Sequence, residues 1–451
     1  PYRWGTVADG WSSSNVTQLG SMKFVMVEEE AHVVGDDKLA VKMINGRPGA
    51  MGIASNAPGY ITLGAPWVYA DMIGLMTSVG TGGIPDTDDS DGGTIGGVNF
   101  SYQPDSIVGY YKRIYADAES GLDGMNPNEE AKIIAYLWKG ISTSMAPATG
   151  AMFSSTGSSW QLLIDRDVDI LGKDNNGKPA DGVTLIASAE ETVKELSDWT
   201  RISVPLNYVS DEKPEKANVI ISSADYFNRG NIGNGNTLSA DNVEFVYNSK
   251  LESLTIGDTP LEGFDKDTYI YTIQGELPAV DDIVAVSDGK GAQVDIQEGS
   301  SVIKIIVTGN DGAKNQHVYS LVKEGTTFNA TSIQLNEVKL DGFDPAIFSY
   351  ENLEMSNGIY PVVSVASDPV LTSVNMQLDD AEHTITIIVT DKLNNKDYTY
   401  LLKFNSSEKV INGPQIKGDF EVQTQWGPEG FAEPYRWGTV ADGWSSSNVT
   451  Q

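Results

Sequence analysis

Short runs in which apolar and polar residues alternate recur along most of the 451-residue chain. Clear examples are 106–117, 131–140 and 199–209. Alternation with a period of two places successive side chains on opposite faces of a β-strand, so these runs predict strands. Helical periodicity is scarce. One short helix is predicted over 188–198, where Ser188 with a glutamate three residues later fits a capping box.

Two segments in the C-terminal half repeat one another. Leu-x-Gly-Phe-Asp occurs at 261–265 and again at 340–344, and Ile-Ile-Val-Thr occurs at 305–308 and again at 387–390. Each unit of roughly 80 residues contains short alternating runs separated by turns, which is typical of a small antiparallel β-sandwich. The units resemble the cadherin-like, immunoglobulin-type modules of bacterial surface proteins, which usually act as spacers.

Tryptophan marks a different kind of domain, because all nine tryptophans lie outside 200–425. The N-terminal strands extend over about 250 residues, which fits one large sandwich or jelly roll. The sequence therefore predicts an all-β protein of three domains. We expect a jelly-roll-like sandwich over 1–248 and two immunoglobulin-like sandwiches over 249–326 and 327–407, followed by a linker and strand segment over 408–451.

Four blocks of the first domain follow one another in a familiar order. They are 58–64, 96–113, 198–208 and 218–247. Together they resemble the "putative carbohydrate metabolism domain" family, which occurs on secreted or surface proteins of glycan-foraging bacteria. The resemblance covers most of 19–248. It implies a carbohydrate-binding-like jelly roll and a location outside the cell or on the bacterial cell surface.

The two ends of the chain share one sequence, because residues 1–18 recur without change at 434–451. Diverged duplication does not preserve every position. Two interpretations remain open: the chain is one period of a tandem array cut at an arbitrary phase, or the segment was duplicated artificially.

The family resemblance also implies that the first domain opens with a strand of the Gly-Asp-Phe-Glu type. We expect this strand to be missing from the N-terminal domain, because Gly-Asp-Phe-Glu occurs only near the C-terminal end, at 418–421. A sandwich without one strand exposes unpaired backbone groups that a strand of another chain can fill. We expect copies of the chain to associate head to tail, or the tail to continue into a next repeat. The expected assembly strand consists of Gly418, Asp419, Phe420, Glu421, Val422 and Trp426.

Aromatic residues beside arginines are candidate sugar-binding positions. A flat ring stacks against the C–H groups of a sugar, and arginine donates hydrogen bonds to its hydroxyls. Alternation places such residues on one face of each of three predicted strands. The candidates are Tyr111, Arg113, Tyr115, Tyr136, Trp138, Trp199 and Arg201. The alternative is that these rings fill a second core face of the sandwich, and the sequence leaves both open.

Composition excludes several other functions. The formal net charge of −32 disfavours nucleic acid and anionic membrane surfaces. The chain has no cysteine and only three histidines, which are far apart, so thiolate sites and the usual zinc patterns are excluded. No apolar run approaches the ~18 residues that span a bilayer. We therefore expect no nucleic-acid partner and no membrane insertion.

One acidic cluster raises the question of a structural calcium ion. It consists of Asp86, Asp88, Asp89 and Asp91. The cluster lacks the glycine that calcium-binding helix–loop–helix motifs place at position six, so a solvated acidic loop is the favoured interpretation. No other cofactor is expected.

No pair of carboxylates stands out as the acid and base of a glycoside hydrolase. The sequence thus predicts a non-catalytic surface protein, the repeat unit of an adhesin or filament, with glycan as a candidate partner. The alternatives are a glycan-capture protein of a carbohydrate uptake system and a glycoside hydrolase.

Overall fold

The computed structural model describes most of the chain up to Asn405 and short strands beyond it. Within this described part the protein is all-β, with one α-helix, α2 (Asp167–Leu171), and one 3-10 helix, η4 (Val280–Asp282). No helix there is long and apolar enough to cross a membrane. The described residues are 10–18, 22–34, 37–46, 49–50, 53–54, 56–70, 90–116, 129–147, 160–228, 232–356, 358–405, 423–424, 436–437, 440–441 and 449–450.

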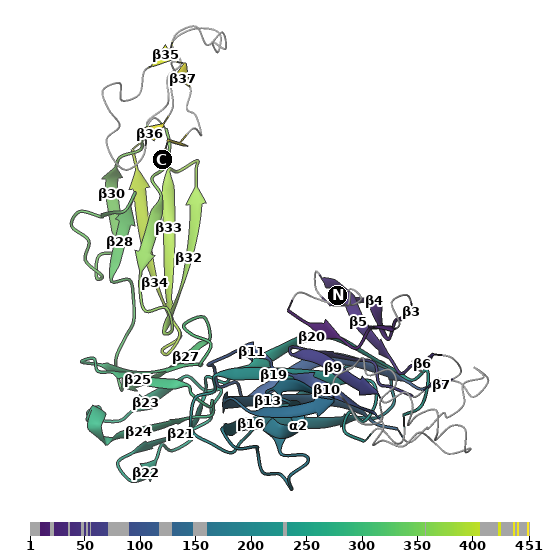
Figure 1. Ribbon diagram of the computed structural model, residues 1–451. Helices are drawn as coiled ribbons and strands as arrows, with labels where there is room; N and C mark the ends of the chain where they lie inside the picture. The colour runs from purple at the N-terminus through teal and green to yellow at the C-terminus, as the bar shows by residue number, and fades with distance from the viewer. Residues whose placement is uncertain are drawn as a thin grey trace. The chain divides into compact units, whose positions relative to one another are not determined.

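The first domain is a sandwich of two antiparallel sheets (Figure 1). The seven-stranded sheet contains, in spatial order, β1 (Ser12–Ser13), β8 (Tyr60–Thr62), β19 (Lys216–Ser222), β13 (Ala131–Gly140), β16 (Val183–Val193) and β18 (Asn207–Tyr208), with β11 (Val98–Asn99) also paired to β19. The five-stranded sheet contains β17 (Leu196–Pro205), β12 (Ser106–Ile114), β20 (Thr237–Val246), β5 (Asp37–Ile44) and β4 (Val27–Val34).

Small two-stranded sheets complete this domain. They are β9 (Ala65–Ala70) with β10 (Ser90–Ile95), β14 (Thr143–Pro147) with β15 (Trp160–Ile164), β2 (Val16–Gln18) with β3 (Met22–Phe24), and β6 (Gly49–Ala50) with β7 (Ile53–Ala54). The main core lies between the two large sheets, where Ile107 and Leu238 of one sheet meet Ile133 and Val219 of the other. The alternation of each strand supplies these side chains.

The helix predicted over 188–198 is wrong. Residues 188–193 belong to β16 and residues 196–198 to β17, and β16 pairs with β13 along its length, from Ala131 opposite Val193 to Gly140 opposite Val183. A capping pattern is a weak local signal, and pairing with a central strand outweighs it. The α-helix that does form, α2, is only five residues long and is too short to give a periodic pattern.

The two smaller sandwiches have the same topology. In the first, a three-stranded sheet of order β22-β21-β24 accompanies a four-stranded sheet of order β23-β27-β26-β25; in the second, the orders are β29-β28-β31 and β30-β34-β33-β32. The first uses β21 (Leu251–Ile256), β22 (Thr259–Pro260), β23 (Ile270–Ile273), β24 (Ile283–Ser287), β25 (Gln293–Gln297), β26 (Val302–Thr308) and β27 (Gln316–Lys323). The second uses β28 (Ser332–Leu335), β29 (Val338–Lys339), β30 (Ser349–Leu353), β31 (Val363–Ala366), β32 (Thr372–Asp379), β33 (Thr384–Asp391) and β34 (Lys396–Phe404).

The repeated Gly-Phe-Asp segment forms the same turn in both sandwiches. In the first, the Tyr271 hydroxyl donates to the Asp265 carbonyl at 2.7 Å and accepts from the Asp265 amide at 2.9 Å. In the second, the Tyr350 hydroxyl makes the same two bonds with Asp344, at 2.9 and 3.0 Å. The glycine before each phenylalanine has a positive φ, which explains why this position is glycine.

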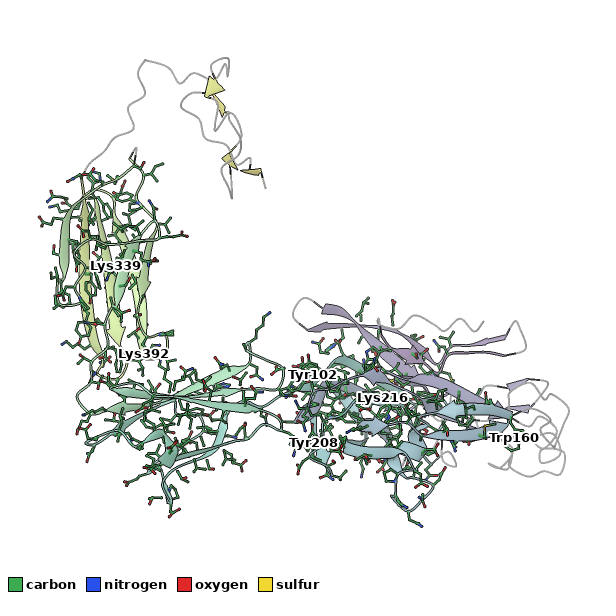
Figure 2. The ribbon with its side chains drawn as sticks, turned by 60° about the vertical axis from the view of Figure 1, so that its left-hand side comes forward. Tyr102, Trp160, Tyr208, Lys216, Lys339 and Lys392 are labelled. Atoms are coloured by element: carbon green, nitrogen blue, oxygen red, sulfur yellow. The ribbon has the colours of Figure 1, made fainter. Side chains whose placement is uncertain are left out.

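The chain divides into two compact units, residues 1–271 with 276–321, and 272–275 with 322–451. Within the first unit, hydrogen bonds join the jelly-roll-like domain to the first small sandwich. Asp105 accepts from the backbone amides of Asn248 at 2.7 Å and Lys290 at 2.6 Å. The Lys290 ammonium of the small sandwich also lies 5.2 Å from the centre of the ring of Tyr208 (labelled in Figure 2), which belongs to the first domain.

Candidate functional site

The expected ring platform on β13 is corrected by the structure. Tyr136 and Trp138 share one face of the strand, as the alternation predicts, but both side chains are completely buried. They belong to a second core on the outer side of the seven-stranded sheet, which we call the buried cluster. Its members are Tyr60, Ile134, Tyr136, Trp138, Ile170, Ile220 and Tyr226.

The buried cluster is closed by α2 and held by polar bonds. Ile170 of α2 packs into it, and the Asn218 amide donates to the Tyr136 hydroxyl at 2.7 Å. Burial, with the nearby Asp167 carboxyl, raises the pKa of Tyr136 well above its usual range. The β13 strand is therefore buried on both faces, and its rings act as core residues rather than as a sugar platform.

The candidates on β12 are corrected in the same way. Tyr111 faces the main core and Arg113 is fully buried beneath it. The Arg113 guanidinium lies 3.3 Å from the Glu129 carboxylate and donates to the Ser223 carbonyl, while the Tyr115 hydroxyl donates to the Glu129 carbonyl at 2.6 Å. Burial raises the pKa of Glu129, although hydrogen bonds from Asn236 and the charge of Arg113 oppose that shift. This network ties loops to the strand and buries Tyr111 and Arg113, whereas Tyr115, just after β12, is partly buried with the Arg113 guanidinium 5.0 Å from the centre of its ring.

Trp199 and Arg201 remain accessible on the outer face of the five-stranded sheet. Ile202 and Val204 of the same strand, β17, point into the main core, as the alternation predicts. Arg201 is exposed, and it pairs directly across the sheet with Tyr110 of β12. In the described part of the chain no hydrogen bond or ion pair engages the Arg201 side chain.

Around Trp199 the sheet assembles aromatic and charged groups from four strands. We call this the outer-face site and define it as His32, Tyr110, Lys112, Trp199, Arg201 and Asp241. The His32 ring stacks on Trp199 with 3.8 Å between ring centres and 17° between planes, and it lies 6.0 Å from the Tyr110 ring. The Lys112 ammonium is 5.2 Å from the centre of the Trp199 ring.

Carboxylates fix the orientation of the basic groups at this site. His32 Nδ1 lies 2.5 Å from Asp241 Oδ2, and both side chains are about nine-tenths buried, at 11% and 8% exposure. Lys112 pairs with Glu30, which also accepts a hydrogen bond from Ser239. Burial favours the protonated form of Glu30, but these hydrogen bonds and the Lys112 charge outweigh it and lower the pKa of Glu30. The site is thus a preorganised set of rings, donors and acceptors.

Sequence reasoning missed His32, Tyr110, Lys112 and Asp241. His32 lies on β4, at the far edge of the sheet from β17, so only the fold brings it to Trp199. The alternation does place Tyr110 and Lys112 on the face opposite Tyr111 and Arg113. That signal was present in the sequence, but it does not reveal which face of the strand is covered.

The acidic loop and the assembly strand lie largely outside the described residues. Asp86, Asp88 and Asp89, and Gly418, Asp419, Phe420, Glu421, Val422 and Trp426, are not described. Asp91 is described, and its carboxylate accepts from the Arg166 guanidinium at 2.6 Å. Within the described ranges no group of three or more acidic or histidine side chains could hold a metal ion.

Two buried carboxyl groups of the first domain have raised pKa values, as a catalytic acid would. Burial raises the pKa of Asp167 and of Glu129. Asp167 accepts from the Tyr226 hydroxyl at 2.6 Å and from the Thr94 amide at 3.0 Å. Both groups are enclosed and bonded to their neighbours, so these shifts arise from structural burial and are not evidence of a reaction site.

Comparisons with known proteins do not assign the chain to a family. No family model and no curated protein matches it. A structure of a "putative glycoside hydrolase" from Bacteroides thetaiotaomicron is similar over 50% of this chain and 57% of that chain, with 18% identity and a TM-score of 0.30. Another, from Bacteroides vulgatus, is similar over 49% of this chain and 77% of that chain, with the same identity and TM-score.

The chain spans little more than half the length of the first of these proteins. Likeness at this TM-score carries no argument about fold or reaction. The resemblance drawn from the four sequence blocks therefore stays a prediction.

Proposed function

We propose that this chain is a non-catalytic carbohydrate-binding surface protein, in which the first domain binds a glycan at the outer-face site and the two smaller sandwiches act as spacers. The observation that carries the proposal is the accessible group of Trp199, Tyr110 and Arg201, set beside the His32–Asp241 and Lys112–Glu30 pairs.

The chemistry of this group suits a sugar. The His32 ring covers one face of Trp199, so the part of Trp199 that stays exposed and the Tyr110 ring offer apolar surface for the C–H face of a pyranose, and Arg201 offers donors to its hydroxyls. Asp241 is an acceptor whose position is already fixed by His32. Preorganised polar groups lose little freedom on binding, which favours affinity for a ligand that is itself heavily hydrated.

The charge of the whole chain narrows the ligand class. A net charge of −32 repels uronic acids and sulfated sugars at low salt, so neutral polysaccharides are the expected ligands. Two tandem immunoglobulin-like sandwiches are a common way to hold a binding domain away from a cell surface, which supports placing the protein outside the cell.

The test is binding of the full chain to a panel of neutral and acidic polysaccharides. We expect binding to at least one neutral glycan, and Trp199→Ala to weaken it at least about tenfold, since aromatic anchors dominate such contacts. The matched control is Trp160→Ala, because Trp160 is 59% exposed and lies at the end of the first domain away from Tyr208 (Figure 2). This variant should bind as the wild type does.

Two results would contradict the proposal. If no glycan binds, or if Trp160→Ala and Trp199→Ala weaken binding equally, the outer-face site is not the binding surface. If the intact protein releases reducing ends from a bound polysaccharide, the protein is catalytic and the glycoside hydrolase alternative replaces the binding module.

A further inference from the structure

A groove opens along one side of the first domain, between its two large sheets. Its volume is about 400 Å³. Acidic and amide groups of β4 and β20 form part of its wall, and the rest of the lining is mainly apolar. The apolar side chains are Trp11, Leu39, Ala40, Val41, Ile61, Ala240 and Val243. Leu39 is 61% exposed, so a large aliphatic side chain of the groove is reached by solvent.

Strand edges with unused pairing capacity border the groove. Among the described strands, β1 is two residues long and pairs only with β8, and β4 pairs only with β5. At the start of β4 the Asn15 side chain already accepts from the Met26 and Val27 amides and donates to the Val27 carbonyl, so the unpaired edge of β4 begins after Val27. Ser13 of β1 is completely buried, and its hydroxyl has no hydrogen-bond partner in the described part of the chain. An apolar groove beside open strand edges is the arrangement that accepts an added strand.

The chain itself indicates the occupant. The groove residue Trp11 belongs to the segment 1–18, whose identical copy stands at 434–451. In that copy, β37 (Val440–Ala441) pairs antiparallel with β35 (Gln423–Thr424), with Gln423 opposite Ala441 and Thr424 opposite Val440. The same Val-Ala pair occurs in the sequence just before Trp11, outside the described residues, so the N-terminal segment carries a copy of the sequence that β35 pairs with inside its own chain.

The sequence leading into β35 matches the groove. Residues 418–424 read Gly-Asp-Phe-Glu-Val-Gln-Thr, an alternation that places Phe420 and Val422 on one face of a strand. A cavity of ~150 Å³ accommodates a benzene ring, so a groove of this size holds a phenyl ring and an isopropyl group together. The polar residues of the segment would then face solvent.

We propose that this groove is the docking site for residues 418–424 of a second copy of the chain, which adds a strand to the first domain of its neighbour. Each copy then uses its tail on one partner and its groove on another, so the contact is head to tail and does not close on itself. This inference names a different partner from the proposed glycan, although Asp241 borders both the groove and the outer-face site.

The absence of native cysteine makes a direct test possible. One preparation carries Leu39→Cys and the other carries Phe420→Cys, and the two are mixed under mild oxidation. We expect a covalent dimer, because a disulfide forms only where Cα atoms come within about 7 Å. The control replaces Leu39→Cys by Val284→Cys, on an exposed strand of the first small sandwich, and should give little dimer.

Three results would overturn the proposal: no dimer, equal dimer with the Val284→Cys control, or a crosslink that forms only within a single chain carrying both Leu39→Cys and Phe420→Cys.

A second measurement does not depend on crosslinking. Light scattering of the wild type should show an average molecular mass that rises with protein concentration, and Leu39→Arg and Phe420→Arg should each abolish that rise. Because Leu39 is mostly exposed, Leu39→Arg should leave the melting temperature unchanged, which separates lost docking from lost folding. A wild type that stays monomeric at all concentrations contradicts head-to-tail association.

Discussion

The buried cluster on β13 and the outer-face site on β12 and β17 are both built from aromatic residues on regular strands, yet they lie in opposite environments. Trp138 and Tyr136 are completely enclosed, whereas Trp199 is only partly buried and its neighbour Arg201 is exposed. The two regions differ in whether other residues cover the sheet face on which the rings lie. Helix α2 and the residues around Tyr226 seal one sheet face, and the described strands leave the other accessible. Composition alone therefore does not distinguish a core from a platform.

The largest expected effect comes from exchanging a tryptophan of each group for alanine. Trp138→Ala should lower the free energy of unfolding by about 3–5 kcal/mol, because it leaves a large cavity in a sealed core. Trp199→Ala should cost about 1 kcal/mol or less, as expected for a partly exposed position. Urea unfolding of the two variants measures the difference, and equal losses would show that the outer-face site is part of the core.

Arg113 and Lys112 give a matched pair of neighbouring cations on opposite faces of β12. Arg113→Met should destabilise the protein by about 3–5 kcal/mol, because Glu129 is left buried without its charge partner. Lys112→Met should cost about 1 kcal/mol or less, because its pair with Glu30 is reached by solvent. Adding Glu129→Gln to Arg113→Met should restore part of the loss, and no recovery would mean that the ion pair is not what holds this site.

Removing one tyrosine hydroxyl from each region should give a smaller difference in stability than removing a whole side chain. Tyr136→Phe should cost about 1–3 kcal/mol, because the buried Asn218 amide loses its acceptor. Tyr110→Phe, on the outer face, should change stability by no more than about 0.5 kcal/mol. Thermal unfolding measured side by side distinguishes the two, and a larger loss for Tyr110→Phe would reverse the assignment of faces.

The smallest effect is a change in how stability depends on pH. Burial raises the pKa of Asp167 in the folded state above its usual value of 3.8. The folded protein then holds the proton to higher pH than the unfolded chain, so this contribution is fully present below pH 3.8 and is lost as pH rises through the folded pKa. Asp167→Asn should therefore make the decline of stability with rising pH less steep than in the wild type. Parallel pH profiles would contradict a raised pKa at this position.

Much of the architecture follows from the sequence. The Gly-Phe-Asp and Ile-Ile-Val-Thr repeats predicted two equivalent sandwiches, and the strand orders and the Tyr271 and Tyr350 turns are the same in both. Local signals suffice there, because the turn uses residues six positions apart. The helix expected over 188–198 failed because its pairing partner, β13, is distant in the sequence and supplies the deciding contacts.

The sequence by itself determined which residues share a face of each strand: Tyr136 with Trp138, and Trp199 with Arg201, opposite Ile202 and Val204. Side-chain direction in a strand is a local property of the backbone, so alternation is enough to fix it. Only the tertiary structure decided which of those faces is sealed and which is reached by solvent. That outcome depends on α2 covering one sheet and on β4 bringing His32 to Trp199, contacts between segments that no local pattern connects.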